Sequence, residues 1–320
     1  MAGHTGKFGC STVAAGTLAV VGLSACGGGS GPASGAAAPS TIAVPATTVA
    51  APKTTAVATT APLSTAPATT TPAATAGAAL ARFPEPVRSA LTMLAGRTTV
   101  PLAGPTRLDT TAPVSATAGY GSGADRGDTS LAPAAGGYLV ALYVCPRGRA
   151  HPVNDPRIAG DCEGAATTLG GFAGRPEPSP AAAVAALPAV VSPTGGPGGA
   201  DASPCPAGSP TTVVDRQPVA TCGTIAGVPG PATVSWSEGE WTIVYSMGNG
   251  MTVTEAVGPL IRRLDTELLP AHPGRIFVEE GGDGEHTTAA WAAGSAVYSV
   301  FDYHDAVGAA DLAVSTRLAS

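Results

Sequence analysis

The sequence predicts an α+β fold: an antiparallel sheet with helices on one face, preceded by a signal peptide and a disordered stalk. Three observations predict the folded part. Short apolar runs of strand type are separated by turn residues, and segments with helical periodicity lie among them. Four cysteines in the same region fall into two pairs of equal spacing.

Strands are expected where β-branched and aromatic residues gather between turn signals. The first, over 137–144, is an uninterrupted apolar run, which is typical of a buried strand. The spacing of four later strands, over 211–215, 219–225, 232–236 and 241–246, favours an antiparallel meander. Beyond a helix, strands over 275–280 and 285–291 are expected to form a hairpin around the glycines of 281–284, and a further strand is expected over 295–301.

Helical periodicity of apolar residues predicts three helices, over 87–94, 253–269 and 305–318. The second begins with a capping box, because Thr252 and Glu255 have the T-x-x-E spacing. Pro259 lies inside this helix and is expected either to kink it or to be its first residue.

Residues 80–320 are expected to form one disulfide-stapled domain with a Pro/Gly-rich surface loop over 175–210. The alternative for this segment is an interdomain linker, and residues 181–189 within it have the composition of one or two helical turns.

A short pattern occurs twice in the second half of the chain. Trp236-x-x-Gly239, a strand and a helix are followed by Trp291-x-x-Gly294, a strand and a helix. The repetition indicates either an internal duplication or the ordinary recurrence of such units in αβ proteins.

The N-terminal segment, residues 1–25, has the pattern of a signal peptide. His4 and Lys7 give a polar, weakly basic start, and an apolar run over 13–23 follows. That run is too short to span a bilayer, which takes about 20 apolar residues.

The run ends in Leu23-Ser24-Ala25-Cys26, followed by three glycines. This sequence resembles the lipobox of bacterial lipoproteins, in which the cysteine is acylated and becomes the new N-terminus. The resemblance covers residues 13–78 and, with the Ala-, Gly-, Pro- and Thr-rich composition, is to actinobacterial lipoproteins. It implies lipidation of Cys26 and a location on the outer face of the cell membrane. Ordinary cleavage near Ala25 and an uncleaved anchor are the alternatives.

Residues 26–79 consist almost wholly of small residues, threonine and proline, with Lys53 as their only charge. Such a segment buries too little apolar surface to fold, so it is expected to be a disordered stalk.

The formal charge of −6 becomes −7 once Lys7 is removed with the signal peptide. A mildly acidic protein lacks the excess positive charge that binds nucleic acid, and it is not attracted to anionic lipid. We therefore expect the protein to attach to the membrane through covalent lipid. Lysine occurs only at Lys7 and Lys53, which excludes the lysine-dependent NTPase and penicillin-binding motifs from the folded region.

The remaining cysteines are expected to form two disulfides, as an even number does in an exported chain. Cys145 with Cys162, and Cys205 with Cys222, both read C-P-x-G-x₁₃-C, so each pair is expected to close a local loop of the same size. Loops of this length contribute about 3 kcal/mol in the chain-entropy model. A zinc site or a redox pair needs closer cysteine spacing.

Two polar clusters have a chemical and a structural interpretation. Glu279, Glu280, Asp283, Glu285 and His286 suggest a metal loop, but the tip of a hairpin is the favoured interpretation. Asp302, Tyr303, His304 and Asp305 suggest a histidine–carboxylate base, but capping of the next helix is favoured.

No catalytic residue, metal ligand or cofactor is assigned. Trp236, Trp241 and Trp291 can line a ligand groove, but a chain with 4% aromatic residues needs them in its core. The expected function is non-enzymatic binding of a hydrophobic or envelope-derived ligand, or of an envelope protein. An envelope hydrolase with an unrecognised site and a structural or sensory partner of a membrane protein are the alternatives.

Overall fold

The structure is a computed structural model that describes residues 79–121, 135–146, 148–162, 168–191, 203–225, 227, 229–248, 250–281 and 284–319. All of the described residues belong to one compact unit. The predicted signal peptide, Cys26 and the predicted stalk up to residue 78 lie outside the described residues.

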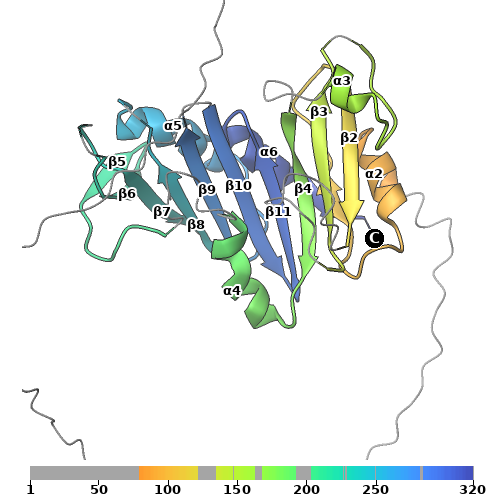
Figure 1. Cartoon of the computed structure of the whole chain (residues 1–320). Helices are drawn as coiled ribbons and strands as arrows, with labels where there is room; N and C mark the ends of the chain where they lie inside the picture. The colour runs from red at the N-terminus through yellow and green to blue at the C-terminus, as the bar shows by residue number, and fades with distance from the viewer. Residues whose placement is uncertain are drawn as a thin grey trace, which may run out of the picture. The chain divides into compact units, whose positions relative to one another are not determined.

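Ten of the described strands form one sheet in the order β2-β3-β4-β11-β10-β9-β8-β7-β6-β5 (Figure 1). Every neighbouring pair is antiparallel except β8 and β9, which are parallel. The order of elements along the chain is α2 (Val87–Leu94), β1 (Ala103–Pro105), β2 (Val114–Tyr120), β3 (Tyr138–Val144), α3 (Ile158–Asp161), β4 (Thr168–Pro176), α4 (Pro180–Val191), β5 (Thr211–Val214), β6 (Gln217–Cys222), β7 (Thr233–Glu238), β8 (Trp241–Ser246), α5 (Val253–Leu264), β9 (Gly274–Gly281), β10 (Gly284–Ala293), β11 (Ala296–Asp302), α6 (Ala306–Ser315) and β12 (Thr316–Leu318).

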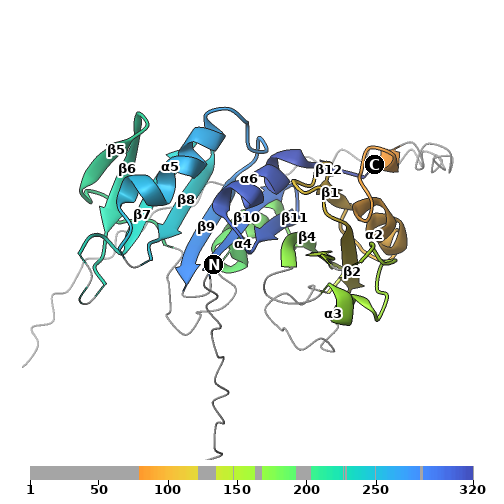
Figure 2. The ribbon, with the colours of Figure 1, turned by 90° about the horizontal axis from the view of Figure 1, so that it is seen from above.

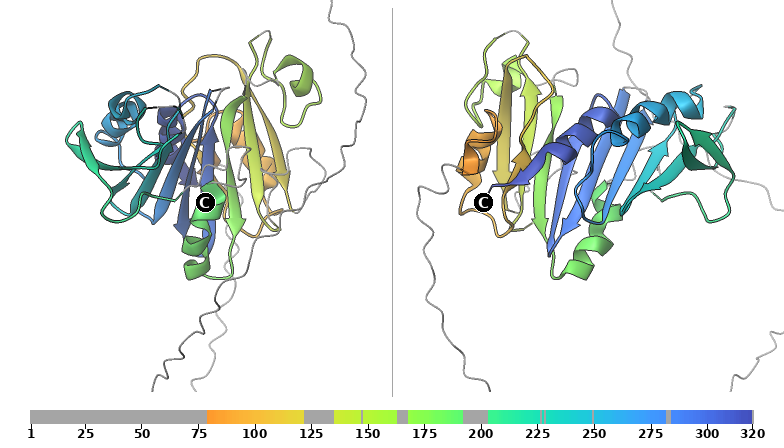
Figure 3. Two further views of the ribbon diagram at one scale, coloured as in Figure 1. Left: turned by 60° about the vertical axis from the view of Figure 1, so that its left-hand side comes forward. Right: turned by 180° about the vertical axis from the view of Figure 1, so that it is seen from behind.

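The α+β class and the mostly antiparallel sheet are therefore confirmed. The main core lies between one face of the sheet and helices α2, α5 and α6. Figure 2 shows α5 and α6 side by side along this face. The prediction that the helices share one face is wrong for α4, which packs its own apolar cluster against the opposite face, over β8 to β11. The front and back views in Figures 1 and 3 show the two layers.

Helix α4 also corrects the loop predicted over 175–210. Ser179 accepts a hydrogen bond from the backbone N–H of Ala182, and Pro180 occupies the first helical position, where a missing N–H costs nothing. Ala183, Leu187 and Val191 then form a buried stripe. Residues 175 and 176 belong to β4, and residues 192–202 lie outside the described part.

The predicted helices over 253–269 and 305–318 are both shorter in the structure. Helix α5 has the predicted capping box and contains Pro259, but it ends at Leu264. Helix α6 ends at Ser315, where Thr316 turns to an extended conformation. Thr316–Leu318 then pair as β12 with β1, so the segment after α6 lies beside the segment that follows α2.

Strand β4 is central to the sheet although glycine is usually depleted in strands. A Cβ on Gly171 would lie 2.4 Å from the ring of Phe301, and one on Gly174 would lie 2.5 Å from the ring of Tyr138. The two glycines therefore make room for aromatic rings from the neighbouring strands, and the sequence patterns did not predict this strand.

The two edges of the sheet differ. On β2, the side chain of Asn154 accepts a hydrogen bond from Ala118 N at 2.8 Å and donates one to Ala118 O at 2.9 Å. Its own N–H donates to Ala116 O. A single asparagine thus pairs with the edge strand much as another strand would. At the other edge, β5 bears Val213 with 69% of its surface exposed.

Both predicted disulfides are present. Cys145 is joined to Cys162 and Cys205 to Cys222. The first closes the segment that carries Asn154 and α3 beside β2, and both of its cysteines are buried. The second ties the chain ahead of β5 to the end of β6.

The repeated pattern corresponds to matching structure. In both copies the glycine has a positive φ, +57° at Gly239 and +60° at Gly294, in a two-residue hairpin turn. The hairpins β7–β8 and β10–β11 are followed by α5 and α6 on the same face.

Candidate functional site

A cavity of about 710 Å³ opens beside α6, on the face of the sheet that carries the main core. The segment after β1 forms one side, α6 the other, and the ends of β4 and β11 contribute to its lining. Its apolar lining consists of Leu108, Leu169, Val307 and Leu312. A volume of this size is in the range of small-molecule sites.

The N-terminus of α6 forms one end of the cavity. Asp305 is the N-cap residue, and its carboxylate accepts a hydrogen bond from Gly308 N at 2.6 Å. Capping is thus the observed role of Asp305, as the sequence favours. Gly308 and Val307 from the first turn line the cavity.

Asp302 lies below this turn at the end of β11. It is only 5% exposed, and it lines the cavity. Its Oδ1 accepts hydrogen bonds from the backbone N–H groups of His304, at 2.7 Å, and Asp305, at 3.1 Å. Burial raises the pKa of Asp302, and the nearby Asp305 carboxylate adds to the rise.

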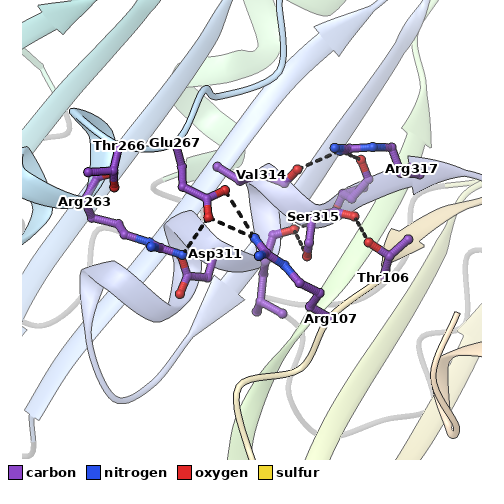
Figure 4. A network of polar contacts seen from close by, with 11 residues as sticks. Thr106, Arg107, Arg263, Thr266, Glu267, Asp311, Val314, Ser315 and Arg317 are labelled. Carbon is purple, nitrogen blue, oxygen red and sulfur yellow. Dashed lines mark hydrogen bonds and ion pairs between the residues drawn. The ribbon is translucent and has the colours of Figure 1, made fainter. Parts of the chain in front are cut away.

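The other end of the cavity is formed by an ion-pair network (Figure 4). Arg263 of α5 contacts Asp311 of α6 at 2.5 Å and Glu267 at 3.1 Å. Glu267 also binds Arg107 from the segment after β1, at 3.2 Å. The network joins three parts of the chain. Both guanidinium groups have carboxylate partners.

A second carboxyl lies under α6. Glu285 accepts a hydrogen bond from the Tyr245 hydroxyl at 3.0 Å. Burial raises its pKa, and the charges of Asp305 and Glu280 raise it further. Glu280 in turn accepts a hydrogen bond from Gly248 N.

The described residues of the acidic cluster at 279–286 lie along the β9–β10 hairpin. Glu279 and His286 face each other across the β9–β10 hairpin, as the structural interpretation requires. Among the described residues, no three His, Cys, Asp or Glu side chains are grouped to hold a metal ion. Asp283 lies outside these residues.

The histidines that the sequence singles out have different surroundings. His286 is half-buried and packs edge-on against Tyr303, with 5.1 Å between ring centroids. His304 is exposed and lines the cavity, but Asp302 binds its backbone N–H rather than its ring. The histidine–carboxylate base suggested by this cluster is therefore not assembled.

The three tryptophans belong to the core rather than to a groove. Trp236, Trp241 and Trp291 are each at most 5% exposed. Trp241 packs against Trp291 with 6.1 Å between ring centroids, and its indole N–H donates to Pro270 O.

Sequence reasoning placed Asp302, His304 and Asp305 together but missed the other side of the cavity. Arg107, Leu108 and Asp109 follow a three-residue strand that no periodicity indicates, and Leu169 lies in the glycine-rich β4. A polar segment with Arg and Asp between two turns was the only available signal, and it is common on protein surfaces.

No helix among the described residues is long and apolar enough to cross a membrane. No protein-family model, curated protein or solved structure matches the chain.

Proposed function

We propose that the protein is a lipoprotein held at the outer face of the cell membrane by acylated Cys26. We further propose that its folded domain binds a small amphipathic envelope molecule in the α6 cavity without transforming it. The observation that carries the second part is the cavity itself, which combines an apolar lining with charged groups fixed at its two ends.

The lining favours binding over catalysis. None of the described residues that line it is a serine, threonine, cysteine or lysine, so its aspartates and His304 are the groups that could take part in catalysis. The carboxyl of Asp302 is held by backbone N–H groups, and His304 is exposed. We therefore favour a binding domain over the envelope hydrolase.

The described surface also favours a small ligand over a protein partner. Its large exposed apolar side chains come from separate elements and are not gathered into a patch of the kind that marks protein interfaces. These side chains are Tyr120, Val184, Val213, Leu268 and Leu318.

Membrane anchorage is tested by the Cys26→Ala variant in the source cell or a related host. The variant lacks the thiol that would carry lipid, so it is expected to move from the membrane to the soluble extracytoplasmic fraction. Cys10→Ala, which alters the other cysteine near the N-terminus, is the matched control and should stay with the membrane. Retention of the Cys26 variant would refute the anchor.

Binding is tested by native mass spectrometry of the mature chain extracted gently from its own envelope. A reproducible extra mass beyond the covalent lipid, lost on organic extraction, is the expected result. A clean apo mass, with a protein crosslinked to the domain in intact cells, would favour the protein-partner function instead.

A further inference from the structure

The charges that line the cavity are distributed unevenly. Four aspartates against two arginines leave a formal charge of −2 with His304 neutral. Both arginines lie in the network with Asp311 and Glu267 (Figure 4). At the opposite end, Asp302 and Asp305 form no ion pair with any described basic side chain, so the negative charge is concentrated there.

Asp302 has one oxygen left for a ligand. Both of its hydrogen bonds from described residues are accepted by Oδ1, and no described group donates to Oδ2. Oδ2 is not among the fully buried side-chain atoms that lack a partner, so solvent in the cavity reaches it. A donor from a bound molecule can take the place of that solvent.

Gly308 lets the Asp302 carboxyl pack against the first turn of α6. A Cβ at position 308 would lie 2.7 Å from Oδ2 of Asp302, so the carboxyl would have to shift. Glycine at this position therefore helps to fix where Oδ2 lies at the end of the cavity.

The helix N-terminus does not reverse the sign of this end. A helix start carries about half a positive charge and favours anions. Here Gly308 N already has a carboxylate partner in Asp305. The carboxylates of Asp302 and Asp305 outweigh the dipole, so this end of the cavity does not favour an anion.

Resting on the proposed function, we infer that the ligand carries an organic ammonium group, which donates a hydrogen bond to Oδ2 of Asp302 while its hydrocarbon part lies against Leu169, Val307 and Leu312. The described carboxylates are not grouped to coordinate a metal ion, so the chemistry that fits is a single charged donor joined to an apolar body.

Binding should weaken as the pH falls and Asp302 takes up a proton. The other charged or titratable groups around the site are His304, Asp305 and Glu285 at its acidic end, and Asp109, Arg107, Arg263 and Asp311 on the remaining sides. Burial also raises the pKa of Glu285, so its protonation contributes to the same loss of ligand binding at low pH.

The test is an NMR titration of the full chain carrying Cys26→Ala, so that no covalent lipid competes. The probes are hexylammonium, 1-hexanol and hexanoate, which share a chain length and differ in head group, and the amides of Gly308 and Leu312 report occupation. Hexylammonium is expected to bind about tenfold or more tightly than either other probe.

Three variants separate the charge from the cavity. Asp302→Asn keeps an acceptor for both backbone N–H groups and should reduce hexylammonium binding to the level of hexanol, with hexanol unchanged. Gly308→Ala should weaken hexylammonium binding, because the added Cβ displaces Oδ2 of Asp302. Asp265→Asn removes an exposed charge that lies outside the lining and should change binding by less than about threefold.

The outcomes distinguish this inference from the function on which it rests. If all three probes occupy the cavity equally, or Asp302→Asn leaves hexylammonium binding unchanged, the ammonium assignment is wrong although the cavity still binds amphiphiles. If no probe shifts the α6 amides, the cavity does not take small amphiphiles, and both proposals fall.

Discussion

Burial of the Asp302 carboxyl beneath α6 works against the stability of the unliganded fold, and the effect depends on pH. Because its pKa is raised in the folded protein, the carboxyl keeps its proton at pH values where the unfolded chain has lost it. The folded state then binds more protons, so this contribution to stability falls as the pH rises from the ordinary pKa of 3.8 through the raised value.

Asp302→Asn should therefore gain stability relative to the wild type as the pH rises through that window, since asparagine has no proton to lose. Urea unfolding of both proteins over a pH series measures the difference. The groups whose pKa is lowered in the folded state, such as Glu85 and Glu255, occur in both proteins and cancel. A difference that does not vary with pH would show that Asp302 is ionised freely in the folded protein.

Asp305 makes a different contribution, as the N-cap of α6. Asp305→Ala should lower the free energy of unfolding by about 1 kcal/mol, because Gly308 N loses its acceptor. Asp305→Asn keeps an N-cap acceptor and should cost much less. Denaturant unfolding of the two variants at neutral pH measures both. Equal losses would mean that Asp305 stabilises the helix by its charge rather than by its hydrogen bond.

Among the elements, the β2 edge depends on Asn154 and on the disulfide-closed segment that carries it. Asn154 has a positive φ of 61°, so replacement by alanine would mix backbone strain with the loss of hydrogen bonds. Asn154→Gly tolerates this backbone and removes only the side-chain pairing with Ala118. We expect it to destabilise the fold by about 1–2 kcal/mol and to promote self-association through the exposed edge.

Denaturant unfolding gives the first quantity, and sedimentation velocity over a range of concentrations gives the second. Val213→Lys on β5, at the opposite edge, is a useful companion, because it places a charge on an exposed edge strand without altering β2. A monomeric Asn154→Gly protein of normal stability would show that Asn154 does not protect the edge.

The elements that the sequence predicts well are those with strong periodicity. Helix 87–94 and strand 241–246 have the predicted bounds, and the meander and the final hairpin appear in the predicted order. The capping box at Thr252 and Glu255 is present, because its signal is local.

The elements that the sequence does not predict depend on contacts between residues that lie far apart in the chain. Strand β4 has glycines where Phe301 and Tyr138 cross it, and those partners lie far away in the sequence. The prolines in and around helix α4 favoured the prediction of a loop, although Ser179-Pro180 is a helix start. Strand β12 exists because β1 is available to pair with it, which no local pattern indicates.

The candidate site also combines residues that the sequence indicates with residues that it does not indicate. Asp302, His304 and Asp305 are adjacent in sequence and were noticed as a cluster. Their role as one end of a cavity depends on the segment around Arg107, nearly two hundred positions earlier, which Glu267 and Ser315 hold beside α6.

At the scale of the whole molecule, two disulfides close loops beside one large sheet, and the candidate ligand cavity lies on one face of that sheet. The N-terminal segment joins this domain to the lipid that we propose on Cys26. Both disulfides suit an oxidising compartment, which agrees with export. The cavity and helix α4 lie on opposite faces of the sheet, so a change in one can be matched by an equal change in the other.

Because the cavity and α4 lie on opposite faces, a matched pair of variants can test directly whether the α6 cavity holds a small amphipathic molecule. Val307→Trp would fill the cavity from α6, whereas Val184→Trp adds the same volume to an exposed position on α4. Native mass spectrometry of both variants and the wild type, extracted from the same envelope, should find the extra mass in the wild type and Val184→Trp but not in Val307→Trp. An extra mass retained in a folded Val307→Trp protein, or absent from all three proteins, would show that the α6 cavity does not hold such a molecule.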